Sequence, residues 1–306
     1  MNSILSKATR LGSHASGRPP AAVELSPEGV LAGALSASGQ PPVYAFEALP
    51  AGALVPGIAE ANILAKEAVA AAIRSALDQV SPRTRAVSLI LPDNVIRIFI
   101  LDFDALSHKP EEAYPVLRFR LRKMVPFDVE HAGLSYQVLS ENKDECRVLV
   151  AVIPGPVLAE YEAAVRAAGY EPGAVLPSSL TALEVIDSME AVLAVSLSNH
   201  ALTTSITNGN DLLLYRTLDL PEEPALRLTE VRRGIAVAAA YYEDKLQARP
   251  SSVRYAGNRE GSEFARWIDD PELTVVDLAP HPKTGVLTSL GNISLAGIAG
   301  ALAGAH

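Results

Sequence analysis

One order of structural elements occurs twice in this chain, and it constrains the fold more than any other feature. Short apolar runs separated by turns predict three strands, a helix and a strand over residues 21–25, 30–35, 43–48, 58–80 and 86–91. The same order returns over residues 191–197, 201–207, 212–218, 224–246 and 252–255. The repetition predicts a duplicated α/β protein with two related lobes.

Composition agrees with two lobes and limits the chemistry. The chain has 306 residues and 49% of them are hydrophobic, enough for two cores. Its 35 acidic against 26 basic residues give a net charge of −9, which argues against a general nucleic-acid binder. The single cysteine, Cys146, excludes an intramolecular disulfide framework and a multi-cysteine zinc site, and favours a reducing compartment.

A block of different character separates the two repeats. Its apolar periodicity predicts strand, helix, two strands, helix and an extended segment over residues 95–101, 111–124, 134–138, 147–153, 157–168 and 173–176. This βαββαβ content has the composition of a ferredoxin-like unit. We expect an inserted subdomain over residues 93–177.

The two ends of the chain complete the expected division. Residues 1–18 lack the apolar segment of a secretory signal and are expected to form a flexible leader. We expect a first lobe over residues 19–92 and a second over 178–284. The uncharged stretch that follows is rich in glycine and alanine, which fits a terminal helix over 285–305, packed on the first lobe, better than a membrane span.

A duplicated βββαβ unit is typical of the actin-like ATPase fold, a duplicated ribonuclease H-like architecture shared with Hsp70 and hexokinase. The expected insert lies where FtsA-related proteins carry their extra subdomain. Within the insert, LRFRLRKMVPFDVEHAGLSYQVL at 117–139 resembles the signature of the type IV pilus assembly protein PilM family. The similarity runs from about residue 21 to 305 and is strongest in the insert; the matching residues include Arg118, Val125, Pro126, Phe127, Leu134, Tyr136, Gln137, Val138 and Leu139.

The resemblance implies a scaffold of a type IV pilus, or of a related secretion or competence apparatus. PilM-like proteins are cytoplasmic, act at the inner face of the bacterial inner membrane, and bind the cytoplasmic tail of the membrane protein PilN. The implied partners are a PilN-like tail and the pilus motor ATPase, with no nucleic acid, and with membrane association only through partners. The implied tail-binding residues are Arg118, Pro126, Phe127, Tyr136 and Gln137.

The phosphate loops of an actin-like nucleotide site depart from their usual pattern. In place of Asp-x-Gly, the first hairpin carries Glu24, Ser26 and, after a proline, Gly29. Counting back from the Asn208-Gly209 turn places Val195 and Leu197 at the aspartate and glycine positions of the second hairpin. The remnants of a site would then be Glu24, Ser26, Gly29, Ser196, Asn199, Gly257 and Asn258.

These departures predict a degenerate site, no catalytic residues, no metal ligands and no resident cofactor. Three alternatives stay open: an ATPase that binds ATP and magnesium and whose nucleotide state regulates pilus assembly, a GspL-like type II secretion component, and a sugar or acetate kinase. No Walker or Rossmann motif occurs. The basic residues Arg118, Arg120, Arg122 and Lys123 form either a solvated face or a docking surface for an acidic partner or the anionic leaflet.

Overall fold

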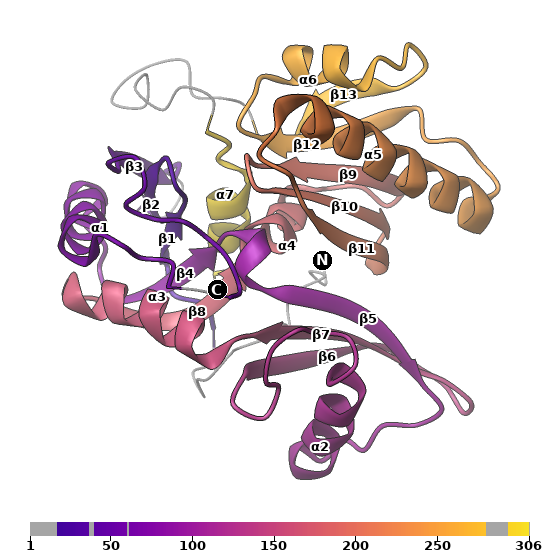
Figure 1. Cartoon of the computed structure of the whole chain (residues 1–306), viewed down its shortest axis with the longest axis horizontal. Coiled ribbons are helices and arrows are strands. Elements are labelled where there is room, and N and C mark those ends of the chain that lie inside the picture. The colour runs from indigo at the N-terminus through magenta and orange to yellow at the C-terminus, as the bar shows by residue number, and fades with distance from the viewer. Residues whose placement is uncertain (1–16, 37–39, 60, 280–292, 306) are drawn as a thin grey trace.

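The computed structural model describes residues 17–36, 40–59, 61–279 and 293–305. Most of the expected leader, residues 1–16, and the first part of the expected terminal helix, residues 285–292, lie outside the described residues. Two five-stranded sheets and one three-stranded sheet make up the described chain, which confirms the duplicated α/β architecture with an insert (Figure 1).

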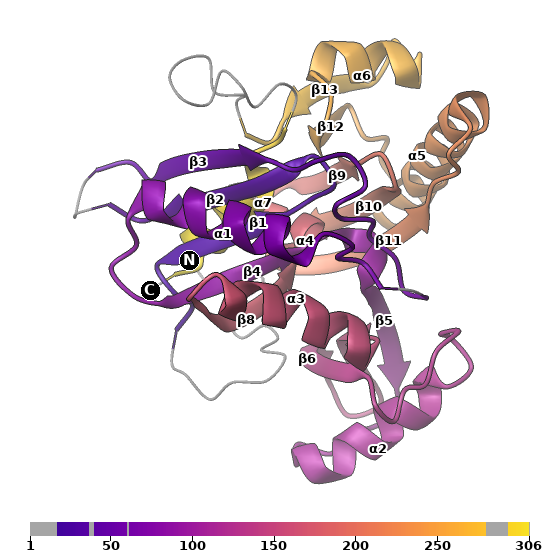
Figure 2. The same cartoon turned by 60° about the vertical axis from the view of Figure 1, so that its left-hand side comes forward.

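The first lobe is a mixed sheet with helices on both faces. Its strand order is β3-β2-β1-β4-β8, where the strands span Val43–Ala48, Gly29–Ala34, Ala21–Leu25, Ala86–Leu91 and Glu171–Pro177. Helices α1 (Lys66–Val80) and α3 (Gly155–Ala167) pack on Val23 and the other side chains of one face. Helix α7 (Ala296–Ala303) packs on Ala22 and Leu31 of the opposite face. Helix α7 therefore belongs to the first lobe (Figure 2).

The second lobe repeats this sheet. Its order is β11-β10-β9-β12-β13, where the strands span Asp211–Asp219, Ala201–Asn208, Ala191–Leu197, Ser252–Gly257 and Thr274–Asp277. Helix α5 (Pro224–Leu246) begins where Glu223 accepts hydrogen bonds from two backbone N–H groups, and α6 (Gly261–Ile268) lies beside it. The stripe Val231, Ile235 and Ala238 of α5 is buried on the sheet.

The insert forms its own small sheet of three antiparallel strands in the order β5-β7-β6, covered by one helix. The strands span Arg97–Phe103, Cys146–Ile153 and Gly133–Glu141, and α2 spans Pro110–Leu121. Leu117 and Leu121 of α2 pack on alternate residues of β7, among them Val148 and Val150. This core is separate from those of the two lobes.

The sequence prediction placed α3 and β8 in the insert, and the structure differs. Strand β8 pairs in parallel with β4, and buried α3 side chains such as Val157 and Tyr161 belong to the core of the first lobe. The three-stranded sheet thus uses only residues 97–153, instead of the whole span 93–177. The local pattern of strands and helices does not specify which sheet edge a strand joins, because that pairing is a long-range contact.

Two short helical segments join the lobes beneath α7. The segments are α4 (Ser178–Ala182) and the 3-10 turn η2 (Leu183–Val185). A Cβ at Gly300 of α7 would lie 1.8 Å from the carbonyl oxygen of Thr181, so only glycine permits this approach. Arg18 lies in a buried ion pair with Glu184, at 3.7 Å between Nη2 and Oε1, so the expected leader ends before residue 18.

In the described ranges, no helix is both long enough and apolar enough to cross a bilayer.

Candidate functional site

Two equivalent hairpin turns face each other across the cleft between the lobes. The β1–β2 turn runs from Ser26 to Gly29, and the backbone N–H of Ser26 donates to the Gly29 carbonyl at 3.0 Å. The β9–β10 turn runs from Ser198 to Ala201, and the same bond recurs there at 2.9 Å. Since Leu25 pairs with Val30 and Leu197 with Leu202, the two hairpins have the same register.

This register corrects the sequence prediction for the second phosphate hairpin by one residue. Ser196 is the counterpart of Glu24, and Ser198 is the counterpart of Ser26, so Val195 and Leu197 do not occupy the aspartate and glycine positions. Both side chains are instead buried in the core of the second lobe. The sequence count started from the Asn208-Gly209 turn, which joins β10 to β11, whereas the hairpin equivalent to β1–β2 turns at Ser198–Ala201. The second hairpin still lacks a carboxylate and a glycine.

Glu24 is held inside the cleft. Ser178 Oγ donates to Glu24 Oε1 at 2.5 Å, and both carboxylate oxygens lie within 3 Å of where a Cβ on Gly297 would be. Burial raises the pKa of Glu24 from 4.5 to about 7, partly offset by the Ser178 hydrogen bond, and the charge of Asp93 raises it further. At neutral pH this carboxyl is therefore partly protonated.

Asp93 connects the first lobe to the second. Its carboxylate accepts hydrogen bonds from the Ser179 backbone N–H at 3.0 Å, from Ser179 Oγ at 2.7 Å and from Thr203 Oγ1 at 3.3 Å. Burial raises the pKa of Asp93, and these three donors oppose the shift. The carboxylate oxygens of Asp93 therefore already accept hydrogen bonds from α4 and from β10.

The cleft is narrow where phosphates would lie. Asn199 Nδ2 donates to Glu28 Oε1 at 2.9 Å and so joins the two hairpin turns directly. The cavity, which Ser196, Gly257 and Asn258 also line, has a volume of about 120 Å³, whereas sites for small ligands usually measure about 300–1,000 Å³. Its carboxylates would also repel phosphate. Among the described residues, no group of three or more His, Cys, Asp or Glu side chains is placed to hold a metal.

The structure puts the five predicted tail-binding residues in or beside the core of the insert. Phe127 and Tyr136 are half-buried against that core, and Tyr136 stacks edge-on with Tyr114 at 5.5 Å between ring centroids. Pro126 is exposed and Gln137 is half-buried on β6. None of them lines the groove described below.

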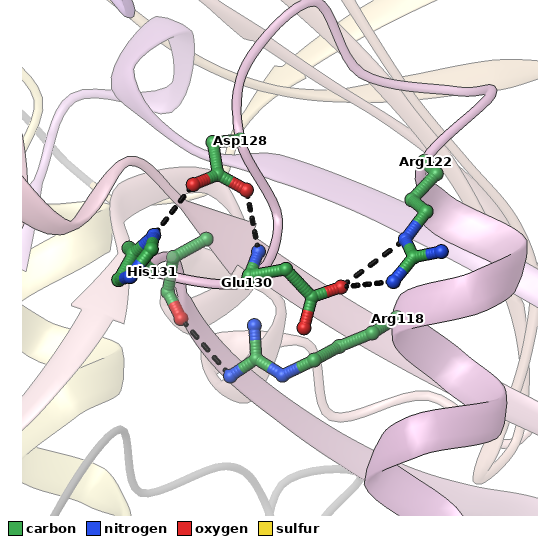
Figure 3. A network of polar contacts seen from close by, with 6 residues as sticks. Arg118, Arg122, Asp128, Glu130 and His131 are labelled. Carbon is green, nitrogen blue, oxygen red and sulfur yellow. Dashed lines mark hydrogen bonds and ion pairs between the residues drawn. The ribbon is translucent and has the colours of Figure 1, made fainter.

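Arg118 belongs to a polar network that holds the loop after α2 (Figure 3). Arg118 Nη2 donates to the Ala132 carbonyl at 3.3 Å, and Arg122 donates to Glu130 at 2.7 Å. Asp128 contacts His131 Nδ1 at 2.6 Å, which raises the pKa of His131 and lowers that of Asp128. The network holds the loop that carries Pro126 and Phe127.

A larger and more apolar groove lies between α3 and the residues 58–59 and 61–66. Its volume is about 650 Å³. Ala159, Ala163 and Ala167 recur every four residues along α3 and expose only methyl groups, which leaves the groove open. Its other lining side chains are mostly apolar and include Ile58, Ile63, Pro154, Pro156 and Val157, while Lys66 and Glu160 supply charge.

A hydrogen-bonded clamp makes one wall of this groove rigid. The Glu160 carboxylate accepts from the backbone N–H groups of Asn62 and Ile63 at 2.7 and 2.8 Å. Asn62 Oδ1 accepts from the Gly57 backbone at 2.9 Å and from the buried hydroxyl of Tyr161 at 3.1 Å. These hydrogen bonds hold the wall in place, which would lower the cost of ordering it when a ligand binds.

The resemblance implies a tail-binding groove involving the first lobe and the insert, but the residues that line this groove were not among those predicted from the sequence. The alanines at 159, 163 and 167 could have indicated the groove, because they lie on the face of the predicted helix opposite its buried apolar stripe. The other wall comes from a segment about one hundred positions earlier, so no local pattern could identify it.

Comparison with solved structures identifies the architecture. No protein-family model and no curated protein matches the sequence. A chain of a PilM-PilN type IV pilus biogenesis complex matches with a TM-score of 0.72 and 16% identity, covering 94% of this chain and 98% of that chain. A Bacteroides thetaiotaomicron protein with an actin-like ATPase fold and unknown function matches with a TM-score of 0.51 and 11% identity, covering 88% and 93%. The chain has the actin-like fold.

The cytoplasmic domain of EpsL, an inner-membrane component of the type II secretion system of Vibrio cholerae, is also similar, with a TM-score of 0.49, 15% identity and coverage of 88% and 92%.

Proposed function

We propose that this chain is a PilM-like scaffold of a type IV pilus or related secretion or competence apparatus, acting by binding and without catalysis. The supporting observation is that its likeness to a chain of the PilM-PilN complex extends over nearly the full length of both chains. The signature-like segment at 117–139 adds to this support, since it folds as the helix, loop and strand of the insert.

The apolar groove is the proposed site for a PilN-like cytoplasmic tail. An extended peptide could lay apolar side chains against the alanine stripe of α3 and against Ile63. Lys66, at the edge of the groove, would favour an acidic group on the tail. Because Glu160 is engaged with the backbone of Asn62 and Ile63, it holds the wall and is not available to the peptide.

This role would place the chain at the inner face of the bacterial inner membrane, attached through its partner. The pilus motor ATPase is a second proposed partner. A GspL-like role in type II secretion is the nearest alternative, and the identity of the captured membrane protein distinguishes it from the pilus role.

The retained carboxylate Glu24 supports a nucleotide-regulated actin-like protein as a second candidate. Calorimetric titration with ATP, with and without magnesium, tests it. Micromolar binding that Glu24→Ala abolishes would establish the nucleotide site and contradict the degenerate cleft; no heat of binding agrees with the narrow cavity.

Co-purification with any short-tailed membrane protein whose gene neighbours that of this chain tests the scaffold role. We expect capture by the wild type and loss of capture by Ala163→Trp, which fills the groove. The matched control is Ala240→Trp, the same change on an exposed position of α5. Equal capture by both variants would refute the groove assignment, and no capture by the wild type would refute the scaffold role.

A further inference from the structure

Helix α2 presents an apolar and basic surface at the tip of the insert. Phe119 is 69% exposed and Val116, one turn earlier, is 45% exposed. Arg120 and Lys123 flank Phe119, and within the described ranges neither has a carboxylate in ion-pair distance. Arg122, in contrast, is neutralised by Glu130 at 2.7 Å. We call Val116, Phe119, Arg120 and Lys123 the α2 knob.

The second lobe carries a hollow of the opposite character. It has a volume of about 570 Å³ and lies between α5 and the segment 268–273. Its floor is apolar and includes Ile235, Ala236, Ala239, Ile268 and Leu273. Its rim carries four carboxylates and two guanidinium groups, an excess of two negative charges; they are Glu243, Asp269, Asp270, Glu272, Arg232 and Arg249.

The rim charges are partly engaged with each other. Arg249 contacts Glu243 and Glu272, and Arg232 contacts Asp269 at 3.8 Å. The Asp270 carboxylate accepts the backbone N–H of Glu272 at 2.9 Å, and among the described residues no cation lies in ion-pair distance of it. Two negative charges of the rim therefore remain to be balanced, and the α2 knob carries two positive charges without an acidic partner.

We infer that the occupant of this hollow is the α2 knob of a second copy of the same chain. Phe119 and Val116 would enter the apolar floor, while Arg120 and Lys123 would meet the acidic rim. The two surfaces lie at opposite ends of the molecule, α2 below and α5 with α6 above in both views (Figures 1 and 2). The α2 knob therefore cannot reach the hollow of the same molecule, and the contact needs a second copy.

A contact between two different surfaces is heterologous. Further copies can add at both ends, and the assembly becomes a closed ring or an open filament. The inference predicts head-to-tail assemblies, not a two-fold dimer. An anionic membrane fits the α2 knob less well, because lipid-binding patches usually gather about four to eight basic residues and the chain carries a net charge of −9. The inference is independent of the PilN-like tail, since the groove is a separate surface.

Sedimentation velocity over a concentration series tests the inference on the full chain. The wild type should give a weight-average sedimentation coefficient that rises with concentration past the value of a dimer. Phe119→Ser should weaken the association constant at least about tenfold, because an aromatic side chain leaves its apolar contact. Met189→Ser, a change of an equally exposed apolar residue elsewhere, should have no effect.

Mixing two defective variants tests the head-to-tail geometry. Phe119→Ser alone and Asp270→Lys/Glu272→Lys alone should each remain monomeric, while their mixture should form a one-to-one dimer. Such a dimer requires one intact α2 knob and one intact hollow. A wild type that stays monomeric throughout the series, a dimer that survives Phe119→Ser, or α2-dependent binding to anionic vesicles in place of self-association would overturn the inference.

Discussion

The buried carboxyl of Glu24 makes the stability of this protein depend on pH in a defined direction. Glu24→Gln replaces it with a neutral group of the same size that keeps an acceptor for Ser178 Oγ, 2.5 Å away in the wild type. The folded-state pKa is about 7 against 4.5 for a free glutamate. The folded chain therefore binds this proton more tightly than the unfolded chain does.

The sign and size of the change in the free energy of unfolding follow from the difference between the two pKa values. Below about pH 4.5 the carboxyl is protonated in both states, and its contribution is fully present. As the pH rises toward 7 the unfolded chain ionises first, so the free energy of unfolding falls. At about 1.4 kcal/mol per pKa unit, the loss is about 3 kcal/mol above pH 7. Glu24→Gln should match the wild type near pH 4.5 and exceed its stability by up to about 3 kcal/mol at pH 8.

Urea unfolding at a series of pH values measures this difference. Comparing variant with wild type removes the part of the Asp93 titration that does not depend on the charge of Glu24. Glu145→Gln, in an exposed turn, is the matched control and should leave the pH dependence unchanged. A Glu24→Gln variant whose advantage does not grow between pH 5 and 8 would refute the closed-cleft description of this carboxyl.

Four substitutions at three contacts test how the lobes are held together, and each is measured by the free energy of unfolding. Gly300→Ala drives a methyl group into the backbone of α4 and should cost at least about 2 kcal/mol; wild-type stability would contradict the packing of α7. Arg18→Met leaves Glu184 buried without its cation and should cost about 3 to 5 kcal/mol; a negligible effect would mean that residue 18 belongs to a leader. A double-mutant cycle of Asn199→Ala and Glu28→Ala should give a coupling of about 0.5 to 1.5 kcal/mol; a coupling of zero would mean that the hairpin turns are not joined.

The sequence predicts the elements of this fold well because their periodicities are local. Helix α5 has the bounds Pro224–Leu246 that its apolar stripe indicates, and the repeated order of elements is enough to predict two related sheets. Prediction fails where pairing is long-range. Strand β8 joins β4 across the whole insert, and no local pattern specifies that pairing.

The same distinction between local and long-range contacts applies to the residues of the sites. The hairpin remnants Glu24 and Asn199 could be found from sequence, because the turns that carry them are local. The bond from Asn199 to Glu28 that narrows the cleft could not, because it joins residues of different lobes. The groove depends on two segments about one hundred residues apart, and each looks unremarkable by itself.

The most direct test of the proposed function is a calorimetric titration with a synthetic peptide. The peptide is the cytoplasmic tail of a PilN-like protein, chosen from membrane proteins whose genes neighbour that of this chain. We predict saturable one-to-one binding by the wild type and by Ala240→Trp, and loss of binding by Ala163→Trp. Binding of equal strength by Ala163→Trp, or no binding by the folded wild type, would contradict the account.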